Sequence, residues 1–157
     1  MSAKIAVISA SWNEKIVNSA EKSFIKAMEE KGFQHDQIDI IKVPGSLEIP
    51  LSGKIALESG YDIAVGIGFV VDGGIYRHEF VGHTVVQSIL DVSIATNKPF
   101  LSVVLTPKAY NEDLEVYEEM YVKHMVEKGA AAANACARML DVPAEITGQQ
   151  KNKAAYV

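Results

Sequence analysis

The stretch GIGFVVDGGIYRHEFV, residues 66–81, decides the fold of this 157-residue chain. It begins as an apolar run that suits a buried strand, breaks at an Asp-Gly-Gly turn, and continues past His78 into a long apolar segment. A strand, a loop and a helix in this order predict that His78 stands beyond the carboxyl end of a strand. Ligands of open α/β sheets bind at that edge. We therefore expect His78 to be the acid/base residue of an enzyme, because an imidazole titrates near neutral pH.

Apolar runs and helical periodicities alternate on both sides of this stretch. The expected strands are residues 4–10, 37–43, 61–71 and 100–105. The expected helices are residues 13–31, 50–60, 79–97, 111–127 and 130–140, with Asn13 as an N-cap and Gly32, Gly60 and Gly129 as breaks. The polar tail, 142–157, is expected to fray or to lie on a neighbour. Strands that alternate with helices predict an α/β fold in one domain, residues 1–157, with a four-stranded parallel sheet covered on both faces.

The helix expected at residues 79–97 is apolar around most of its circumference. Its strongly polar residues form a narrow stripe, spaced four apart, at Glu79, His83, Gln87 and Asp91. A helix of this kind is buried. Either a second subunit covers part of it, or it is wedged between the sheet and the two terminal helices.

Composition narrows the classes of function. The chain is 48% hydrophobic and 22% charged, as globular proteins are, and its net charge of −5 argues against general nucleic-acid binding. The single cysteine, Cys136, can form no internal disulfide, which suits a reducing compartment. No apolar run approaches the roughly 18 residues of a membrane span. We expect a cytoplasmic protein that has no membrane partner.

Several familiar motifs are ruled out by their spacing. His78 and His83 resemble the H-E-x-x-H zinc pattern but lie five residues apart, roughly 140° around a helix, so they do not chelate one metal. The Gly66-Ile67-Gly68 segment lacks the third glycine of a dinucleotide fingerprint and lies inside a strand. No phosphate-binding P-loop and no G-x-S-x-G elbow occur in the sequence. We expect no metal site.

The loops that follow the expected strands should gather at one edge of the sheet. They are residues 11–13, 44–48, 72–78 and 106–107. Trp12, the only tryptophan, is either a core anchor or a flat surface on which an aromatic ring stacks. Glu48 either accepts hydrogen bonds from a polyol or is simply a first-turn acid that suits the helix dipole.

Four segments carry a resemblance to a known family. VPGSLEIP at residues 43–50 resembles the VPGA-x-EIP signature of the lumazine synthases, and GGIYRHEFV at residues 73–81 resembles the loop that holds their catalytic histidine. SWN at residues 11–13 and VVLTP at residues 103–107 occupy the places of the family's aromatic-Asn turn and V-L-T strand end. The combination is most similar to the second type of lumazine synthase, found in certain bacteria.

The resemblance implies a three-layer α/β/α sandwich of flavodoxin-like topology. It implies a condensation of 5-amino-6-(D-ribitylamino)uracil with 3,4-dihydroxy-2-butanone 4-phosphate, without a cofactor, to 6,7-dimethyl-8-ribityllumazine in riboflavin biosynthesis. It also implies pentamers, arranged as a decamer in the second type, with sites between neighbouring subunits.

The resemblance further implies a role for each site residue. His78 would carry protons. The residues that would bind substrate are Trp12, Ser46, Leu47, Glu48, Phe69, Val70, Val71, Ile75, Tyr76, Ser102 and His124. Among them, Trp12 would stack on the pyrimidine, residues 46–48 would hold the ribityl chain, residues 69–71 would line the ring pocket, and residues 75–76 would meet the butanone phosphate.

The chain departs from the common pattern of the family at several of these positions. Ser102 stands where a neighbouring subunit usually supplies a phenylalanine, and Met120 stands near the usual phosphate-binding arginine. His124 is the favoured substitute for that arginine, with Lys128 and Arg77 as alternatives. These departures leave open a flavin or lumazine carrier without catalysis. The alternating α/β pattern and the acidic charge leave open a flavodoxin-like electron carrier.

Overall fold

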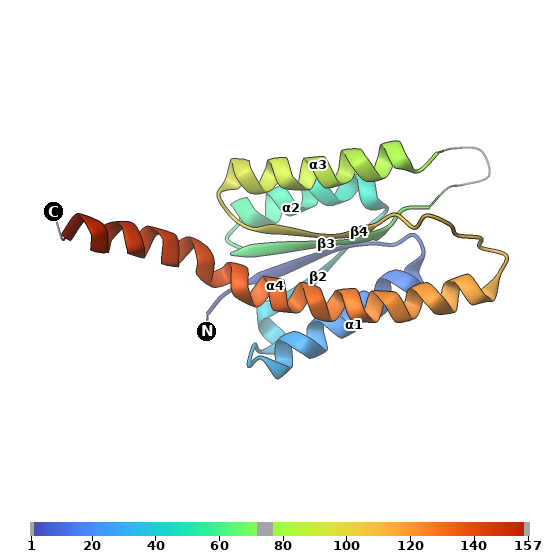
Figure 1. The fold of residues 1–157 in the computed structure, drawn as a ribbon, viewed down its shortest axis with the longest axis horizontal. Coiled ribbons are helices and arrows are strands. Elements are labelled where there is room, and N and C mark those ends of the chain that lie inside the picture. Colours follow the sequence, from blue (N-terminus) through green and yellow to red (C-terminus); the bar gives the residue numbers. More distant parts are fainter. Residues whose placement is uncertain (1, 72–76, 156–157) are drawn as a thin grey trace.

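The chain folds into a four-stranded parallel sheet between two layers of helices (Figure 1). The computed structural model describes residues 2–71 and 77–155, with side chains as far as residue 148. The strands, in chain order, are β1 (Ile5–Ala10), β2 (Ile38–Val43), β3 (Ile63–Phe69) and β4 (Phe100–Leu105). The helices are α1 (Glu14–Glu30), α2 (Ile49–Glu58), α3 (Glu79–Thr96) and α4 (Glu115–Ala155), with short 3-10 helices η1 (His35–Gln37) and η2 (Ser46–Glu48).

The strand order is β2-β1-β3-β4, and every pairing is parallel. In the register, Ile5 of β1 lies opposite Ile38 of β2 and Ile63 of β3. The two central strands, β1 and β3, are buried along their whole length, which explains why they are apolar on both faces. The predicted three-layer α/β/α fold with flavodoxin-like topology is therefore confirmed.

Each face of the sheet has its own apolar core. Helices α1 and α4 cover one face, where Phe24, Met28, Met125 and Cys136 are fully buried. Helices α2 and α3 cover the other, where Ile49, Ile89 and Phe100 meet. Because α4 packs beside α1 on the face opposite α3 (Figure 1), the wedge alternative for the helix at residues 79–97 is wrong.

The outer surface of the α2–α3 layer remains apolar in the single chain. Phe80 and Ile94 of α3 are 70% and 77% exposed, and Leu51 and Ile55 of α2 are exposed as well. These four side chains face solvent at a cost that burial under another surface would remove. That a second subunit covers part of α3 stays a prediction.

The two helices expected after residue 110 are one continuous helix, so the break predicted at Gly129 is wrong. Helix α4 passes through Gly129 and Pro143 and continues to Ala155, so the tail expected to fray or to lie on a neighbour is helical as far as that residue. Its last turns project past the other elements (Figure 1). A Cβ added at Gly129 would lie 2.4 Å from the Ala20 carbonyl oxygen. Gly129 therefore allows α1 and α4 to approach closely, and this packing outweighs its weak helix propensity.

The other helix ends follow the sequence more closely. Gly32 and Gly60 have positive φ angles of 94° and 108° just beyond α1 and α2, as their expected role as helix stops requires. Asn13 does precede α1, but its backbone is left-handed (φ 54°, ψ 47°) and its side chain makes no cap hydrogen bond. In the ranges 2–71 and 77–155, no helix combines the length and apolar character needed to cross a membrane.

Candidate active site

The turn after β1 is tied to the ends of both neighbouring strands. The backbone N–H and the hydroxyl of Ser11 both donate to the Val43 carbonyl at the end of β2, at 2.9 and 2.8 Å. The side-chain amide of Asn13 donates to the Phe69 carbonyl at the end of β3, at 3.2 Å. Because β1 lies between β2 and β3, this turn occupies the topological switch point, where ligands of such sheets bind.

Trp12 lies at the tip of this turn and is 74% exposed. The interpretation of Trp12 as a core anchor is therefore wrong. The indole is close to the segment after β2, since a Cβ added at Gly45 would lie 4.0 Å from Trp12 Cδ1. A large flat ring is thus exposed at the switch point, and hydrogen bonds to the Val43 and Phe69 carbonyls hold its turn on both sides.

The helix η2 places Ser46 directly over β3. A Cβ added at Gly68 would lie 2.4 Å from Ser46 Oγ, so only a glycine lets the hydroxyl approach the strand this closely. Gly66 similarly makes room for Ile49, with 2.7 Å to its Cγ2. Gly66 and Gly68, which form no dinucleotide fingerprint, therefore let the segment at residues 46–49 pack closely on β3. Residues 46–48 of this segment are those expected to hold a ribityl chain.

Glu48 and Leu47 differ in how they are held. The Glu48 carboxylate accepts the Gly45 N–H at 2.9 Å, which fixes it over the start of α2 and favours the helix-start interpretation of this acid. A polyol hydroxyl bound there would share the carboxylate with this N–H. Leu47 is exposed in the single chain.

At the end of β3, the side chains are buried or partly buried, and backbone groups are the parts nearest the site. The Phe69 ring is buried against Tyr110 and Tyr121, with centroid distances of 5.3 and 5.1 Å, while its carbonyl binds Asn13. Val70 is buried in the α2–α3 core, and Val71 is partly buried against the other core. The predicted site residues Ile75 and Tyr76 lie outside the described residues.

His78 stands immediately before α3 and is partly buried. Its carbonyl accepts the Gly82 N–H at 2.9 Å, which places the imidazole at the first turn of the helix. A cavity of about 380 Å³ lies between α3 and the end of β4, and its walls include His78, His83, Gln87 and Thr106. His83, rejected above as a metal ligand, is thus a second imidazole in the same cavity. The described part of the chain holds no group of three or more metal-ligating side chains.

Two predicted site residues lie apart from this edge in the single chain. Ser102 is exposed in the middle of β4, at the border of the sheet, where it pairs in register with Gly66. His124 is exposed on α4, 4.0 Å from Glu127 and on the opposite face of the sheet from α3. Neither is among the residues that line the cavity at His78.

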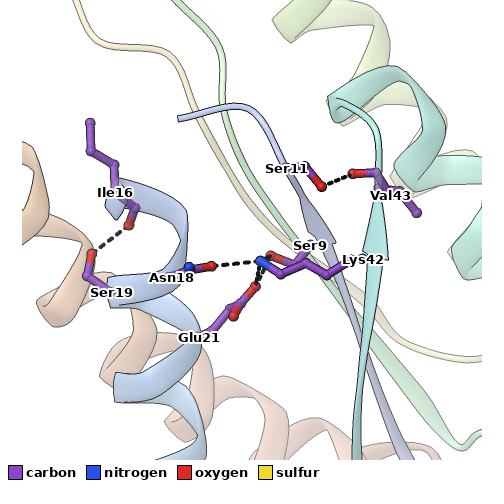
Figure 2. A network of polar contacts seen from close by, with 8 residues as sticks. All are labelled: Ser9, Ser11, Ile16, Asn18, Ser19, Glu21, Lys42 and Val43. Carbon is purple, nitrogen blue, oxygen red and sulfur yellow. Dashed lines mark hydrogen bonds and ion pairs between the residues drawn. The ribbon is translucent and has the colours of Figure 1, made fainter. Parts of the chain in front are cut away.

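A polar network next to the Trp12 turn, formed by Ser9, Asn18, Glu21 and Lys42, was not predicted from the sequence. Figure 2 shows Lys42 of β2 reaching Glu21 and Asn18 of α1 together with Ser9 of β1. Glu21 is only 8% exposed and Ser9 is fully buried. A glutamate beside the apolar positions Val17, Ala20 and Phe24 was the available signal, because a buried carboxylate needs a partner.

Known proteins match this chain over most of its length. The sequence model of 6,7-dimethyl-8-ribityllumazine synthase matches residues 2–144. The chain belongs to the lumazine synthase family. It is 41% identical to the 6,7-dimethyl-8-ribityllumazine synthase 2 of Bradyrhizobium diazoefficiens over 87% of this chain and 82% of the relative. It is 42% identical to the 6,7-dimethyl-8-ribityllumazine synthase of Rhodococcus erythropolis over 84% and 85%, respectively.

Membership of the lumazine synthase family gives the chain its activity. It is an enzyme, a transferase that forms 6,7-dimethyl-8-ribityllumazine in riboflavin biosynthesis. The family also implies small-molecule substrates and assembly of identical subunits. The carrier and flavodoxin-like alternatives are not favoured.

Proposed function

We propose that the switch-point edge binds the ribitylaminouracil, with Trp12 stacked on its pyrimidine ring. The observation that carries this proposal is the 74% exposure of a tryptophan whose turn is tied to two strand ends. Ser46 and Glu48, next to it, supply a hydroxyl and a carboxylate for the ribityl chain. Leu47 borders the pyrimidine ring with its side chain, and residues 69–71 at the end of β3 border it with their backbone.

In the same proposal His78 carries protons for the condensation. An amine of the pyrimidine attacks the ketone of the butanone phosphate, water leaves, phosphate is eliminated, and the second amine closes the ring with loss of another water. Every step moves a proton, and positioned acid/base catalysis contributes about 10²–10⁴-fold. Orientation of two reactants can contribute roughly 7–11 kcal/mol, so positioning dominates. Ile75 and Tyr76 remain predicted contacts of the butanone phosphate.

We infer that the complete site lies between subunits of a pentamer and that two pentamers form a decamer. Ser102 at the sheet border and His124 on the other helical layer do not line the cavity at His78, so a neighbouring copy would supply them. The exposed apolar side chains of α2 and α3 provide a surface for such contacts. His124 would then bind the phosphate. A chain with one thiol suits the cytoplasm.

The experiment for His78 is a turnover assay in which the two substrates are mixed and lumazine absorbance is followed. His78→Ala should slow turnover by about 10²–10⁴-fold but leave measurable activity. His35→Ala is the control, because His35 is exposed beside Glu29 at the start of η1. Complete loss of activity with unchanged substrate binding would contradict a site dominated by positioning.

The experiment for Trp12 measures affinity for the pyrimidine substrate by calorimetry. Trp12→Ala should weaken binding by roughly 1–3 kcal/mol, whereas Trp12→Phe should retain part of it. Val116→Ala, at an exposed apolar position on α4, is the control. An unchanged affinity in Trp12→Ala would reject the stacking role.

A further inference from the structure

The network behind the Trp12 turn joins three elements through one ammonium group. Lys42 Nζ donates to Glu21 Oε1 at 2.5 Å, to Asn18 Oδ1 at 2.7 Å and to Ser9 Oγ at 3.4 Å. The Ser9 hydroxyl in turn donates to the same Glu21 oxygen. The start of α1 is thereby fixed to both β1 and β2 (Figure 2).

The network lies at the ends of β1 and β2, next to the loops of the proposed site. Ser9 and Lys42 are partners in the parallel register, one residue before the strands end at Ala10 and Val43. The Val43 carbonyl then holds Ser11, the neighbour of Trp12. The network therefore fixes the two strands at the point where they continue into the loop that bears Trp12 and the loop that bears η2.

Trp12 needs such a support because it has little packing of its own. With three quarters of its surface exposed, the indole is positioned through its backbone and through the elements on either side. Those elements are β1, which ends at Ala10, and α1, which begins at Glu14. Asn18 and Glu21 are the fifth and eighth residues of that helix.

Stability alone does not account for a charged pair at this place. Glu21 is buried at a desolvation cost, whereas the Lys42 side chain is 37% exposed, so solvent screens the attraction between them. Apolar side chains in place of such a pair are often neutral or stabilising. The surroundings of Glu21 on α1, including Val17 and Phe24, would accept such a replacement. Charged hydrogen bonds add what apolar contacts lack, which is a fixed direction and distance.

We propose that the network of Ser9, Asn18, Glu21 and Lys42 positions Trp12 for the pyrimidine substrate. These are positioning residues that act through the β1–α1 turn and do not touch the substrate. The effect on substrate binding rests on the stacking role proposed above for Trp12. The effect on the placement of the indole does not depend on that role.

The test combines an apolar replacement with a spectroscopic readout. The variant Ser9→Ala/Glu21→Met/Lys42→Met keeps the packing volume and removes the polar links. Because Trp12 is the only tryptophan, its fluorescence anisotropy reports directly on the freedom of this side chain. We expect a thermal midpoint close to that of the wild type, a lower anisotropy, and a KM for the pyrimidine raised about tenfold with kcat and the KM for butanone phosphate nearly unchanged.

Two further variants keep the result interpretable. Glu21→Gln retains the shape of the side chain and the Ser9 hydrogen bond, and should change anisotropy and KM in the same direction but less. It takes the place of the triple variant if that variant does not fold. Arg138→Met/Glu145→Met removes an exposed ion pair on α4 and should leave anisotropy and KM unchanged.

The anisotropy of the substrate-free enzyme decides the proposal. A folded triple variant with wild-type anisotropy would overturn it, whatever happens to KM. A lower anisotropy with an unchanged KM would support the positioning of Trp12 and would reject its stacking role instead.

Discussion

Asn13 shows how one residue can connect two parts of the site. It accepts a left-handed backbone, which asparagine tolerates better than most residues, and it uses its amide to hold the end of β3. The predicted N-cap position of Asn13 is confirmed, and its carbonyl accepts N–H groups in the first turn of α1. Its side chain does not cap the helix, because it binds the Phe69 carbonyl, 56 residues away in the chain.

Asn13→Ala should therefore affect both stability and substrate binding. Loss of the hydrogen bond and left-handed strain should together lower the free energy of unfolding by about 1–3 kcal/mol. The KM for the pyrimidine should rise, because the Trp12 turn loses its link to β3. Urea unfolding and steady-state kinetics measure the two effects.

Asn97 offers a matched control for this substitution. It is the other left-handed asparagine among the described residues (φ 53°) and ends α3, away from the switch point. Asn97→Ala should be destabilised by strain but should keep the wild-type KM. Equal KM changes in both variants would show that the effect of Asn13 is merely structural.

At the scale of single residues, position along the chain was easier to predict than partners. Residues placed after apolar runs, such as Trp12 and Ser46, do lie at the carboxyl edge, because a parallel sheet puts all those ends together. The partners of Lys42 could not be predicted, because they depend on which strand lies beside which and on the face that α1 covers.

The pair of helices α1 and α4 shows the same limit at the scale of elements. Strand and helix types followed from periodicity, and the boundaries of β1, β2, β4 and α3 agree to within a residue or so. The continuity of α4 did not follow, since a glycine in sequence signals a break. Its actual role is visible only when α1 is packed against it.

Gly129→Ala should destabilise the α1–α4 layer. An alanine would gain about 1 kcal/mol of helix propensity, but its Cβ would meet the backbone of α1 at Ala20 and the side chain of Ser23, at 2.4 and 2.9 Å. The backbone of α1 cannot move aside without a cost, so the overpacking penalty of about 1–3 kcal/mol should exceed the gain in helix propensity. Thermal unfolding followed by circular dichroism measures the change.

Gly148→Ala is the comparison within the same helix. A Cβ there meets nothing within 4 Å, so this variant should be neutral or slightly stabilised. If Gly129→Ala were stabilised to the same degree, the close approach of α1 and α4 would not be limiting.

For the whole molecule, the apolar outer surface of α2 and α3 has consequences for stability. Leu51, Ile55, Phe80 and Ile94 are exposed in one chain. The assembly proposed above would bury this surface between copies. Assembly then stabilises the folded state by mass action.

The thermal midpoint of unfolding should therefore rise with protein concentration. Ile55→Lys and Ile94→Lys should weaken assembly, since a charge would have to be buried, and should lower the midpoint most at high concentration. Light scattering gives the molar mass in the same samples. A midpoint independent of concentration, together with a monomeric mass, would contradict this prediction.

The buried cysteine should lower the free energy of unfolding at alkaline pH. Burial raises the pKa of Cys136 from 9.0 to about 12. A raised pKa means that the contribution of the neutral thiol is complete below pH 9 and is lost as pH rises toward 12. By pH 10 the loss should be about 1.4 kcal/mol relative to neutral pH.

Comparison with Cys136→Ala isolates this effect, because the other alkaline groups are common to both proteins. Their difference in unfolding free energy should shrink between pH 8 and pH 10, as denaturant titrations would show; a constant difference would contradict it. Below pH 9 the buried thiol is neutral and out of contact with solvent. Since it is the only thiol in the chain, the rate at which a thiol reagent modifies the native enzyme measures how often the layer of α1 and α4 opens.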